Sequence, residues 1–336
     1  MDRYSIRALA FGFVAALPLG CSPATMTADV PTTDAHETHD TAPTDSAIRD
    51  ESVPADVTDG ALADAGPSDA GRTFSTDPST YFGAPRCGAA GVQLCDDFEA
   101  TAVDSPPDPA VWTVGTWGMG SIAVDTAHAA RGTHAVHIHT PSVPASVTFR
   151  ETRTFPATGN TFYGRMFLFI DHLPRPYMWS DTTNYPLVHW TAASAGGAFE
   201  SGGMTYHPDV RAIGAINQQL LINIDGGPMH EQGIGDMPPA SQPALVEQQW
   251  MCFEFMYGGT GIDSEMRVWW DGVEHTALHL SSTNLGDTGM AWPIPVFASM
   301  SFGWSLYQDY TAIMPGGFDV WIDEVAIDTQ RIGCSL

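Results

Sequence analysis

Short runs of aromatic and β-branched residues, separated by glycine, proline and Asn/Asp clusters, fill the C-terminal two thirds of the chain. Nine such runs are "SIAVD", "HAVHIHT", "ASVTFRETRTF", "FYGRMFLFID", "LLINID", "WMCFEFMY", "EMRVWWDGVEH", "VFASMSFGW" and "FDVWIDEVAID". Several alternate with period two, and no stretch keeps a helical period for three turns. The pattern predicts an all-β fold, an antiparallel β-sandwich of the jelly-roll kind.

Two of these runs make sharper predictions. In "WWDGVE", the dipeptide Asp271-Gly272 is typical of a tight hairpin turn. In "FYGRMFLFI" both faces are too apolar to meet water, so this strand is expected at the centre of a sheet. Arg165, inside that strand, then needs a charged partner or a cleft.

The N-terminus reads as an export signal. "MDRYSIRALAFGFVAALPLGC" has Arg3 and Arg7, then an uncharged apolar run too short to span a bilayer. "LPLGC" resembles a bacterial lipobox, which predicts a signal peptide over residues 1–20 and a lipidated Cys21. The alternative is ordinary signal cleavage. We expect an extracytoplasmic protein, a cell-surface or outer-membrane lipoprotein that meets the membrane only through its lipid anchor.

Residues 21–86 are mostly Ala, Asp, Thr, Pro and Ser, and they predict a disordered tether because they offer little apolar surface to bury. "DAHETHD", with His36 and His39, allows a metal or partner site, but a solvated tether is the favoured interpretation. No second change of composition and no internal repeat follows. Residues 87–336 are therefore expected to form one domain.

The formal charge of the chain is −26, and its 13 basic residues are all arginines. Only eight of them lie beyond residue 86. Nucleic acid is excluded as a partner because phosphate neutralisation needs a basic face. An acidic polysaccharide is also repelled unless a few arginines converge. We expect a monomer.

Four cysteines lie in the expected domain: Cys87, Cys95, Cys252 and Cys334. An even number in an exported domain predicts two disulfides, with three possible pairings. A zinc site is the alternative, although the sequence has no CxxC pair to support it.

Several motifs follow one another in a characteristic order: "DDFE", "VDTAHAARGTHAV", "YGRMFLFI", "WMCFEF", "MRVWWDG", "MSFGWSLY" and "VWIDEVAIDTQRIGC". This order resembles the core domain of fungal cellulose-induced proteins and their bacterial relatives. The last two motifs are the most specific, and the resemblance spans about residues 94–334. It implies a concanavalin A-like β-jelly roll, similar to glucuronan and alginate lyases, with a calcium site and a polysaccharide-sized cleft.

The resemblance also implies which residues bind calcium and which cysteines pair. The calcium ligands are Glu99, Asp323 and the backbone carbonyls of Arg131 and His134, with Asp96 or Asp97 as alternatives to Glu99. Such an oxygen-rich set suits Ca²⁺. The alternative is that these carboxylates cap turns or pair with arginine. The family pairing gives Cys252 with Cys334, and Cys87 with Cys95 by remainder.

For a lyase, the resemblance nominates residues for each step of β-elimination. Arg211 and Gln219 would neutralise the uronate, Tyr307 would act as the acid and His189 as the base, with Arg165 near the same face. Each also has a structural alternative, as a core or rim aromatic, a backbone partner or a buried histidine.

Pure binding is the other hypothesis. Six tryptophans exceed the needs of a core of this size, and indole faces stack on sugar rings; they are Trp179, Trp190, Trp269, Trp270, Trp292 and Trp304. The acidic domain suits a neutral glucan or xylan better than a polyuronate. We therefore expect a calcium-stabilised surface lipoprotein that binds a plant or microbial cell-wall glycan. The alternatives are a polysaccharide lyase and a structural surface protein.

Overall fold

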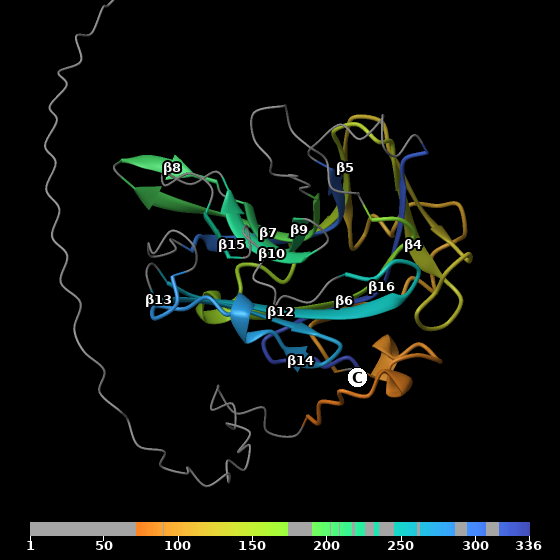
Figure 1. Cartoon of the computed structure of the whole chain (residues 1–336), viewed down its shortest axis with the longest axis horizontal. Helices are drawn as coiled ribbons and strands as arrows, with labels where there is room; N and C mark the ends of the chain where they lie inside the picture. Colours follow the sequence, from red (N-terminus) through yellow and green to blue (C-terminus); the bar gives the residue numbers. More distant parts are fainter. Residues whose placement is uncertain are drawn as a thin grey trace, which may run out of the picture. The chain divides into compact units, whose positions relative to one another are not determined.

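The structure is a computed structural model (Figure 1). It describes residues 72–89, 91–173, 190–201, 203–207, 209–216, 219–225, 232–234, 245–260, 263–285, 294–306 and 316–336, with the backbone alone between 209 and 234. All of these lie within one compact unit, Asp64–Leu336. In this part of the chain the helices are three-residue 3₁₀ turns, and none has the length and hydropathy that a membrane crossing requires.

Two antiparallel sheets of eight strands each form the fold. The first sheet has the order β14-β13-β12-β6-β16-β4-β3, with β1 paired to β16. Its strands are β1 (Leu94–Asp96), β3 (Ser121–Asp125), β4 (Ala135–Thr140), β6 (Phe162–Ile170), β12 (Trp250–Thr260), β13 (Asp263–Trp270), β14 (Val273–Glu274) and β16 (Phe318–Asp328).

The second sheet has the order β11-β10-β9-β7-β15-β5-β2, with β8 paired to β7. Its strands are β2 (Thr113–Trp117), β5 (Ala145–Glu151), β7 (Trp190–Ser201), β8 (Met204–Tyr206), β9 (Asp209–Ile216), β10 (Gln219–Asp225), β11 (Gln232–Ile234) and β15 (Val296–Leu306). Together the sheets form the predicted all-β jelly roll.

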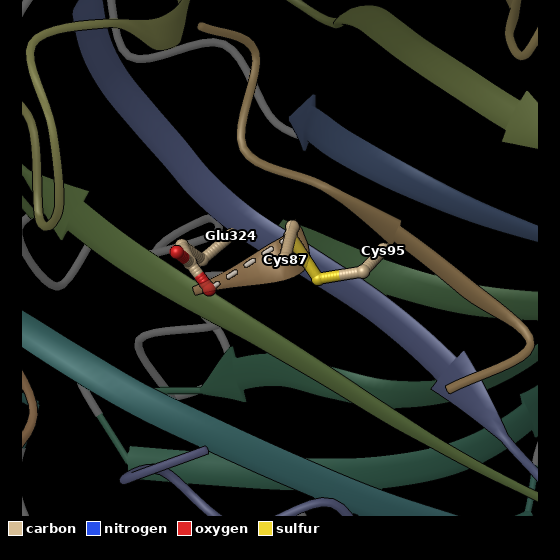
Figure 2. Close-up of side chains that lie close together, drawn as sticks. All are labelled: Cys87, Cys95 and Glu324. Carbon is tan, nitrogen blue, oxygen red and sulfur yellow. Dashed lines mark hydrogen bonds between the residues drawn. A yellow bond between two sulfur atoms is a disulfide. The ribbon is translucent and has the colours of Figure 1, made fainter. Parts of the chain in front are cut away.

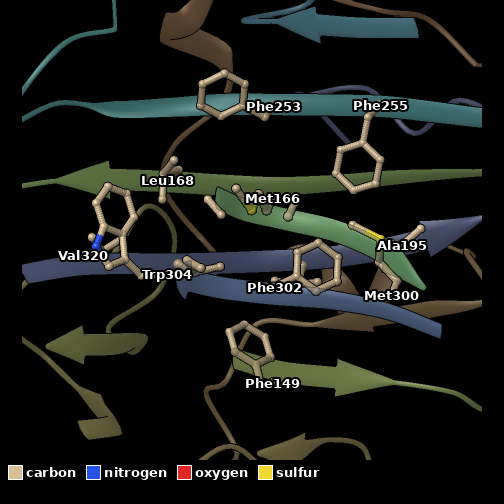
Figure 3. Close-up of a cluster of buried hydrophobic side chains, with 14 of the residues drawn as sticks. Phe149, Met166, Leu168, Ala195, Phe253, Phe255, Met300, Phe302, Trp304 and Val320 are labelled. Carbon is tan, nitrogen blue, oxygen red and sulfur yellow. The ribbon is translucent and has the colours of Figure 1, made fainter. Parts of the chain in front are cut away.

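The main core lies between the two sheets. The second sheet contributes Phe149, Ala195, Met300, Phe302 and Trp304, and the first contributes Met166, Leu168, Phe253, Phe255 and Val320 (Figure 3). All ten are buried. Burial of one such large apolar side chain contributes about 1.5–3 kcal/mol, so this layer is what holds the sheets face to face.

Each of the nine runs found in the sequence falls on a strand, and two local predictions are confirmed. β6 is central, between β12 and β16, and all nine of its residues are buried. The β13–β14 turn places Asp271 at φ 47 and Gly272 at φ 78, as a type I′ hairpin requires.

Two long strands of the second sheet, β7 and β9, were not among the nine runs. "WTAASAGGAFES" in β7 is mostly Ala, Gly and Ser, which have weak β-propensity. Its strand conformation depends on pairing with β15 and β9, and on the burial of small residues such as Ala193 and Ala195.

Residues 72–86, which the sequence predicts to be part of the tether, contact the first sheet. Arg72 pairs with Asp328 at 2.6 Å, and Arg331 lies over the ring of Phe74 at 4.3 Å. Tyr81 is fully buried, and its hydroxyl donates to the carbonyl of Asp271. A few aromatic and arginine side chains are enough to dock this segment, so the described fold includes it. Residues 1–20 and Cys21 lie outside the described part of the chain.

Candidate functional site

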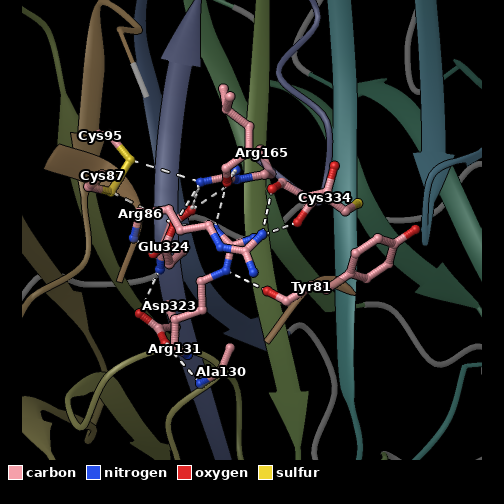
Figure 4. A network of polar contacts seen from close by, with 12 residues as sticks. Tyr81, Arg86, Cys87, Cys95, Ala130, Arg131, Arg165, Asp323, Glu324 and Cys334 are labelled. Atoms are coloured by element: carbon pink, nitrogen blue, oxygen red, sulfur yellow. Dashed lines mark hydrogen bonds and ion pairs between the residues drawn. A yellow bond between two sulfur atoms is a disulfide. The ribbon is translucent and has the colours of Figure 1, made fainter. Parts of the chain in front are cut away.

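A bulge in β16 brings two carboxylates to one polar cluster. The register between β16 and β6 shifts between Asp323 and Ala326, and Glu324 has φ 49. A bulge inserts an extra residue, so neighbouring side chains need not alternate across the sheet. Asp323 and Glu324 both reach the cluster drawn in Figure 4.

The loop before β4 binds two carboxylates through its backbone. Oδ2 of Asp323 accepts N–H bonds from Ala130 and Arg131, at 2.8 and 3.0 Å. Oε1 of Glu99 accepts N–H bonds from Thr133 and His134, at 2.6 and 2.8 Å. The four residues predicted as the calcium site therefore meet on one loop. Asp96 is used otherwise, because its carboxylate accepts from the indole N–H of Trp112.

The two carboxylates differ in their electrostatics. Burial raises the pKa of Asp323 to about 8, against the opposing backbone N–H bonds, and the negative charge of Glu324 adds to the rise. Burial also raises the pKa of Glu99, but the bonds from Thr133 and His134 outweigh it and hold that pKa below its usual value. Of the two carboxyl groups, Asp323 is therefore the one whose ionised form a nearby cation would stabilise more.

These residues fit a hard dication. The other oxygen of each carboxylate accepts one hydrogen bond, Oδ1 of Asp323 from the N–H of Glu324 and Oε2 of Glu99 from the hydroxyl of Thr133, and so keeps a lone pair for an ion. Burial of Asp323 also makes its negative charge costly without a nearby cation. Nδ1 of His134 is buried without a hydrogen-bond partner, so the cluster also contains an unused polar atom. A second group of potential ligands, Cys87, Cys95 and Glu324, is not a metal site because its sulfurs form a disulfide (Figure 2).

Two buried arginines complete the cluster. The guanidinium groups of Arg131 and Arg165 both donate to Oε2 of Glu324, at 2.8 and 2.9 Å, and all three side chains are fully buried. They also donate to the carbonyls of Cys334 and Gly333, respectively (Figure 4). Burial lowers the pKa of Arg131 to about 10, which leaves it charged at neutral pH.

The sequence predicts that Arg165 has either a charged partner or a cleft, and the structure shows a charged partner, Glu324. Arg165 lies in the first sheet, apart from β9 and β10, so its expected place near their face is wrong. Sequence reasoning missed Glu324. The signal was present, since an arginine in a wholly apolar strand demands a buried acid, and "WIDEV" offers one directly after Asp323.

Both disulfides have the pairing that the family resemblance implied. Cys252 in β12 pairs with Cys334, with α-carbons 6.0 Å apart. Cys87 pairs with Cys95, with α-carbons 5.2 Å apart. Disulfides persist in oxidising compartments, which agrees with an extracytoplasmic protein.

Two of the four candidate lyase residues, Arg211 and Gln219, lie on strands of the second sheet. Arg211 is on β9 and Gln219 is on the adjacent β10. Gln219 pairs with Ile216, five positions along β9 from Arg211, a separation of roughly 17 Å at about 3.4 Å per residue. His189 and Tyr307, like the side chains of Arg211 and Gln219, lie outside the described part of the structure.

The expected sugar-stacking tryptophans are mostly core residues. Trp190, Trp269, Trp270 and Trp304 are buried, so that part of the prediction is wrong; Trp179 and Trp292 lie outside the described residues. The apolar layers that they fill are larger than the sequence count suggested. Trp117, at the end of β2, is 62% exposed and had not been singled out.

Comparisons with known proteins agree on the fold. No family model and no curated protein sequence matches the chain. Among solved structures, the cellulose-induced protein Cip1 matches with TM-score 0.53 and 20% identity, over 72% of this chain and 100% of that one. An endo-β-1,4-glucuronan lyase from the fungus Trichoderma reesei matches with TM-score 0.44 and 14% identity, over 71% and 96% of the two chains. The chain thus has the β-jelly-roll fold of the cellulose-induced protein.

Proposed function

We propose that this chain is an exported protein whose jelly-roll domain binds a polysaccharide. The observation that supports the proposal most is the fold itself, which aligns with the whole length of a protein named for its induction by cellulose. Fold likeness alone leaves chemistry open, so binding is the primary function proposed.

The proposed ligand is a neutral cell-wall glycan, such as a glucan or xylan. The charge of −26 supports this choice. Two of the arginines, Arg131 and Arg165, are buried against Glu324 and so do not offer their charge to a ligand. A polyuronate would meet net repulsion at low salt.

We propose further that Ca²⁺ binds between Glu99 and Asp323, with carbonyls of Arg131 and His134 completing the oxygen set. The ion would supply charge neutralisation and would link the segment after β1 to β16. Its role is stability, because no residue of this cluster lies on the second sheet.

A uronate-cleaving lyase is the second candidate. Its support is that Arg211 and Gln219 occupy adjacent strands of one sheet. In that mechanism one of Arg211 and Gln219 would neutralise the carboxylate of the cleaved uronate and the other would bind a neighbouring sugar, while His189 removes the C5 proton and Tyr307 protonates the leaving oxygen. Their spacing along the strands requires that they serve different subsites.

A polysaccharide panel separates the candidates. The purified full chain is incubated with cellulose, xylan, β-glucan, glucuronan and alginate, in calcium. Co-sedimentation with a neutral glycan, without absorbance at about 235 nm, supports binding. Absorbance that disappears in Y307F supports the lyase, since that absorbance reports the unsaturated uronate made by elimination. If neither binding nor absorbance is observed, the remaining candidate is a structural surface protein.

We propose that Cys21 carries a lipid anchor. The chain with its natural N-terminus should partition with membranes and incorporate labelled fatty acid, whereas C21S should be released in soluble form. Equal partitioning of C21S would contradict the anchor.

A further inference from the structure

Four titratable side chains meet on the outer face of the first sheet. His137 and His139 are two residues apart in β4, so their side chains point to one face, while Val136 and Ile138 pack into the core. The register places Asp319 of β16 opposite His139. Asp125 ends β3, the neighbouring strand on the other side.

One carboxylate oxygen lies between the two imidazoles. Oδ1 of Asp319 is 2.8 Å from Nε2 of His137 and 3.0 Å from Nδ1 of His139. The other ring nitrogen of His137, Nδ1, is 3.0 Å from Oδ2 of Asp125. All four side chains are partly exposed, from 23% for Asp125 to 40% for His139, so ions reach them from solvent.

The orientation of His137 is fixed on two sides. Its ring stacks on Trp321 at 4.3 Å with an interplanar angle of 6°. The indole N–H of Trp321 donates to Asp125, at 3.0 Å from Oδ1. Asp125 is thereby held where it accepts the Nδ1–H of His137. This is the arrangement found around metal-bound histidine, whose outer N–H donates to a carboxylate.

The shared contacts of His137 favour a positive charge between its ring and Asp319. A neutral imidazole has one N–H donor. If Asp125 takes that donor, the lone pair of Nε2 faces a carboxylate oxygen, which is repulsive unless a proton or a metal ion lies between. A metal ion bound by both imidazoles and by Oδ1 of Asp319 would remove this repulsion.

We propose that His137, His139 and Asp319 form a surface site for a first-row transition-metal dication, typified by Zn²⁺, with Asp125 as the positioning residue for His137. Two imidazole nitrogens and a carboxylate suit Zn²⁺, Cu²⁺ or Ni²⁺ and do not suit Ca²⁺. Binding draws the two nitrogens in around the ion to about 2.0–2.1 Å, with water in the open positions. The ion links β4 to the paired strand β16, one strand in from the edge strand β3.

Isothermal titration of the full chain with ZnCl₂ tests the site. The titration is done in excess Ca²⁺, which occupies oxygen sites, and in an H36A/H39A background, which removes the imidazoles of "DAHETHD". We expect one zinc ion per chain. H139N and D319N should each weaken binding at least about tenfold, and D125N should weaken it by about 10–100-fold.

H279N is the matched control. His279 also faces a carboxylate, with Nε2 at 2.7 Å from Glu265, but no second histidine among the described residues pairs with Glu265. H279N should bind zinc as the background does. Absence of one-to-one binding, or equal affinity in H279N, H139N and D319N, would overturn the proposal.

A second measurement keeps the proposal testable if a variant misfolds. Cu²⁺ bound to the background chain should show nitrogen hyperfine coupling from two imidazoles in electron paramagnetic resonance. A spectrum with oxygen ligands alone would overturn the site without any substitution in it.

Discussion

Asp323 makes stability depend on pH in the calcium-free protein. Its pKa of about 8 in the fold exceeds the ordinary value of 3.8, so the native state binds the proton more tightly than the unfolded chain. The stabilising contribution is complete below about pH 4 and is lost as the pH rises through 8.

In chelator, the free energy of unfolding of the native chain relative to D323N should therefore fall by a few kcal/mol between pH 5 and 8. Urea denaturation at several pH values measures it. Added Ca²⁺ should reverse most of the loss at pH 8. Parallel curves for the two chains would contradict this assignment.

Gly132 is the residue whose substitution should disturb the calcium loop most selectively. It has φ +66, and a Cβ there would lie 2.2 Å from Oε1 of Glu99. Gly159 has φ +64 but nothing within 4 Å of a Cβ, which makes G159A the control for backbone strain alone.

G159A should cost about 1–2 kcal/mol and keep the full rise in melting temperature on adding Ca²⁺. G132A should cost more and lose most of that rise, because Glu99 must leave its position. Differential scanning calorimetry with and without calcium compares them, and an equal calcium response in both variants counts against the site.

The strand β16 depends on buried charge at its bulge. The negative charge of Glu324 compensates the positive charges of Arg131 and Arg165. Removing one member of a buried ion network leaves the other charges buried without a partner. E324Q should cost about 3–5 kcal/mol in urea denaturation.

E274Q is the matched control, because the Arg267–Glu274 pair is partly exposed. It should cost at most about 1 kcal/mol. A cost for E324Q no larger than for E274Q would mean that Glu324 does not neutralise the arginines.

The strands themselves show which elements are predictable from sequence. β6 and β16 are recognisable in the sequence as long apolar or alternating runs. Burial of these strands requires apolar residues, and the same residues favour the strand conformation. β7 does not, because Ala, Gly and Ser give no local signal and its strand state comes from its neighbours β15 and β9. The bulge at Glu324 is likewise set by pairing with β6 and leaves no local trace.

At the scale of the molecule, the two disulfides should contribute unequally. Cys252–Cys334 closes a sequence separation of 82 residues and Cys87–Cys95 one of 8. The loop-entropy model gives about 4.5 kcal/mol for the first and about 2.5 kcal/mol for the second.

C252A/C334A should thus lower the urea midpoint more than C87A/C95A. Equal losses would indicate that local packing, rather than chain closure, determines the contribution of each bridge.

The candidate site divides in the same way as the fold. The proximity of Glu99 and Asp323 to one loop, and the pairing of the cysteines, were predictable because distant motifs occur in a recognisable order, whereas Glu324 was missed. The docking of residues 72–86 was not predictable. Phe74, Tyr81 and Phe82 are too few to give a local signal, and their role depends on the surface of the first sheet that they cover. The burial of four tryptophans was missed because sequence counts residues without locating them.

The most direct test of the proposed function is an equilibrium binding isotherm of the full chain on insoluble xylan and cellulose, at low and high salt in calcium. Neutral-glycan binding predicts a saturable isotherm on at least one of them, unchanged by salt because no charge is neutralised. Absence of saturable binding to either, or binding confined to alginate and glucuronan, would contradict it.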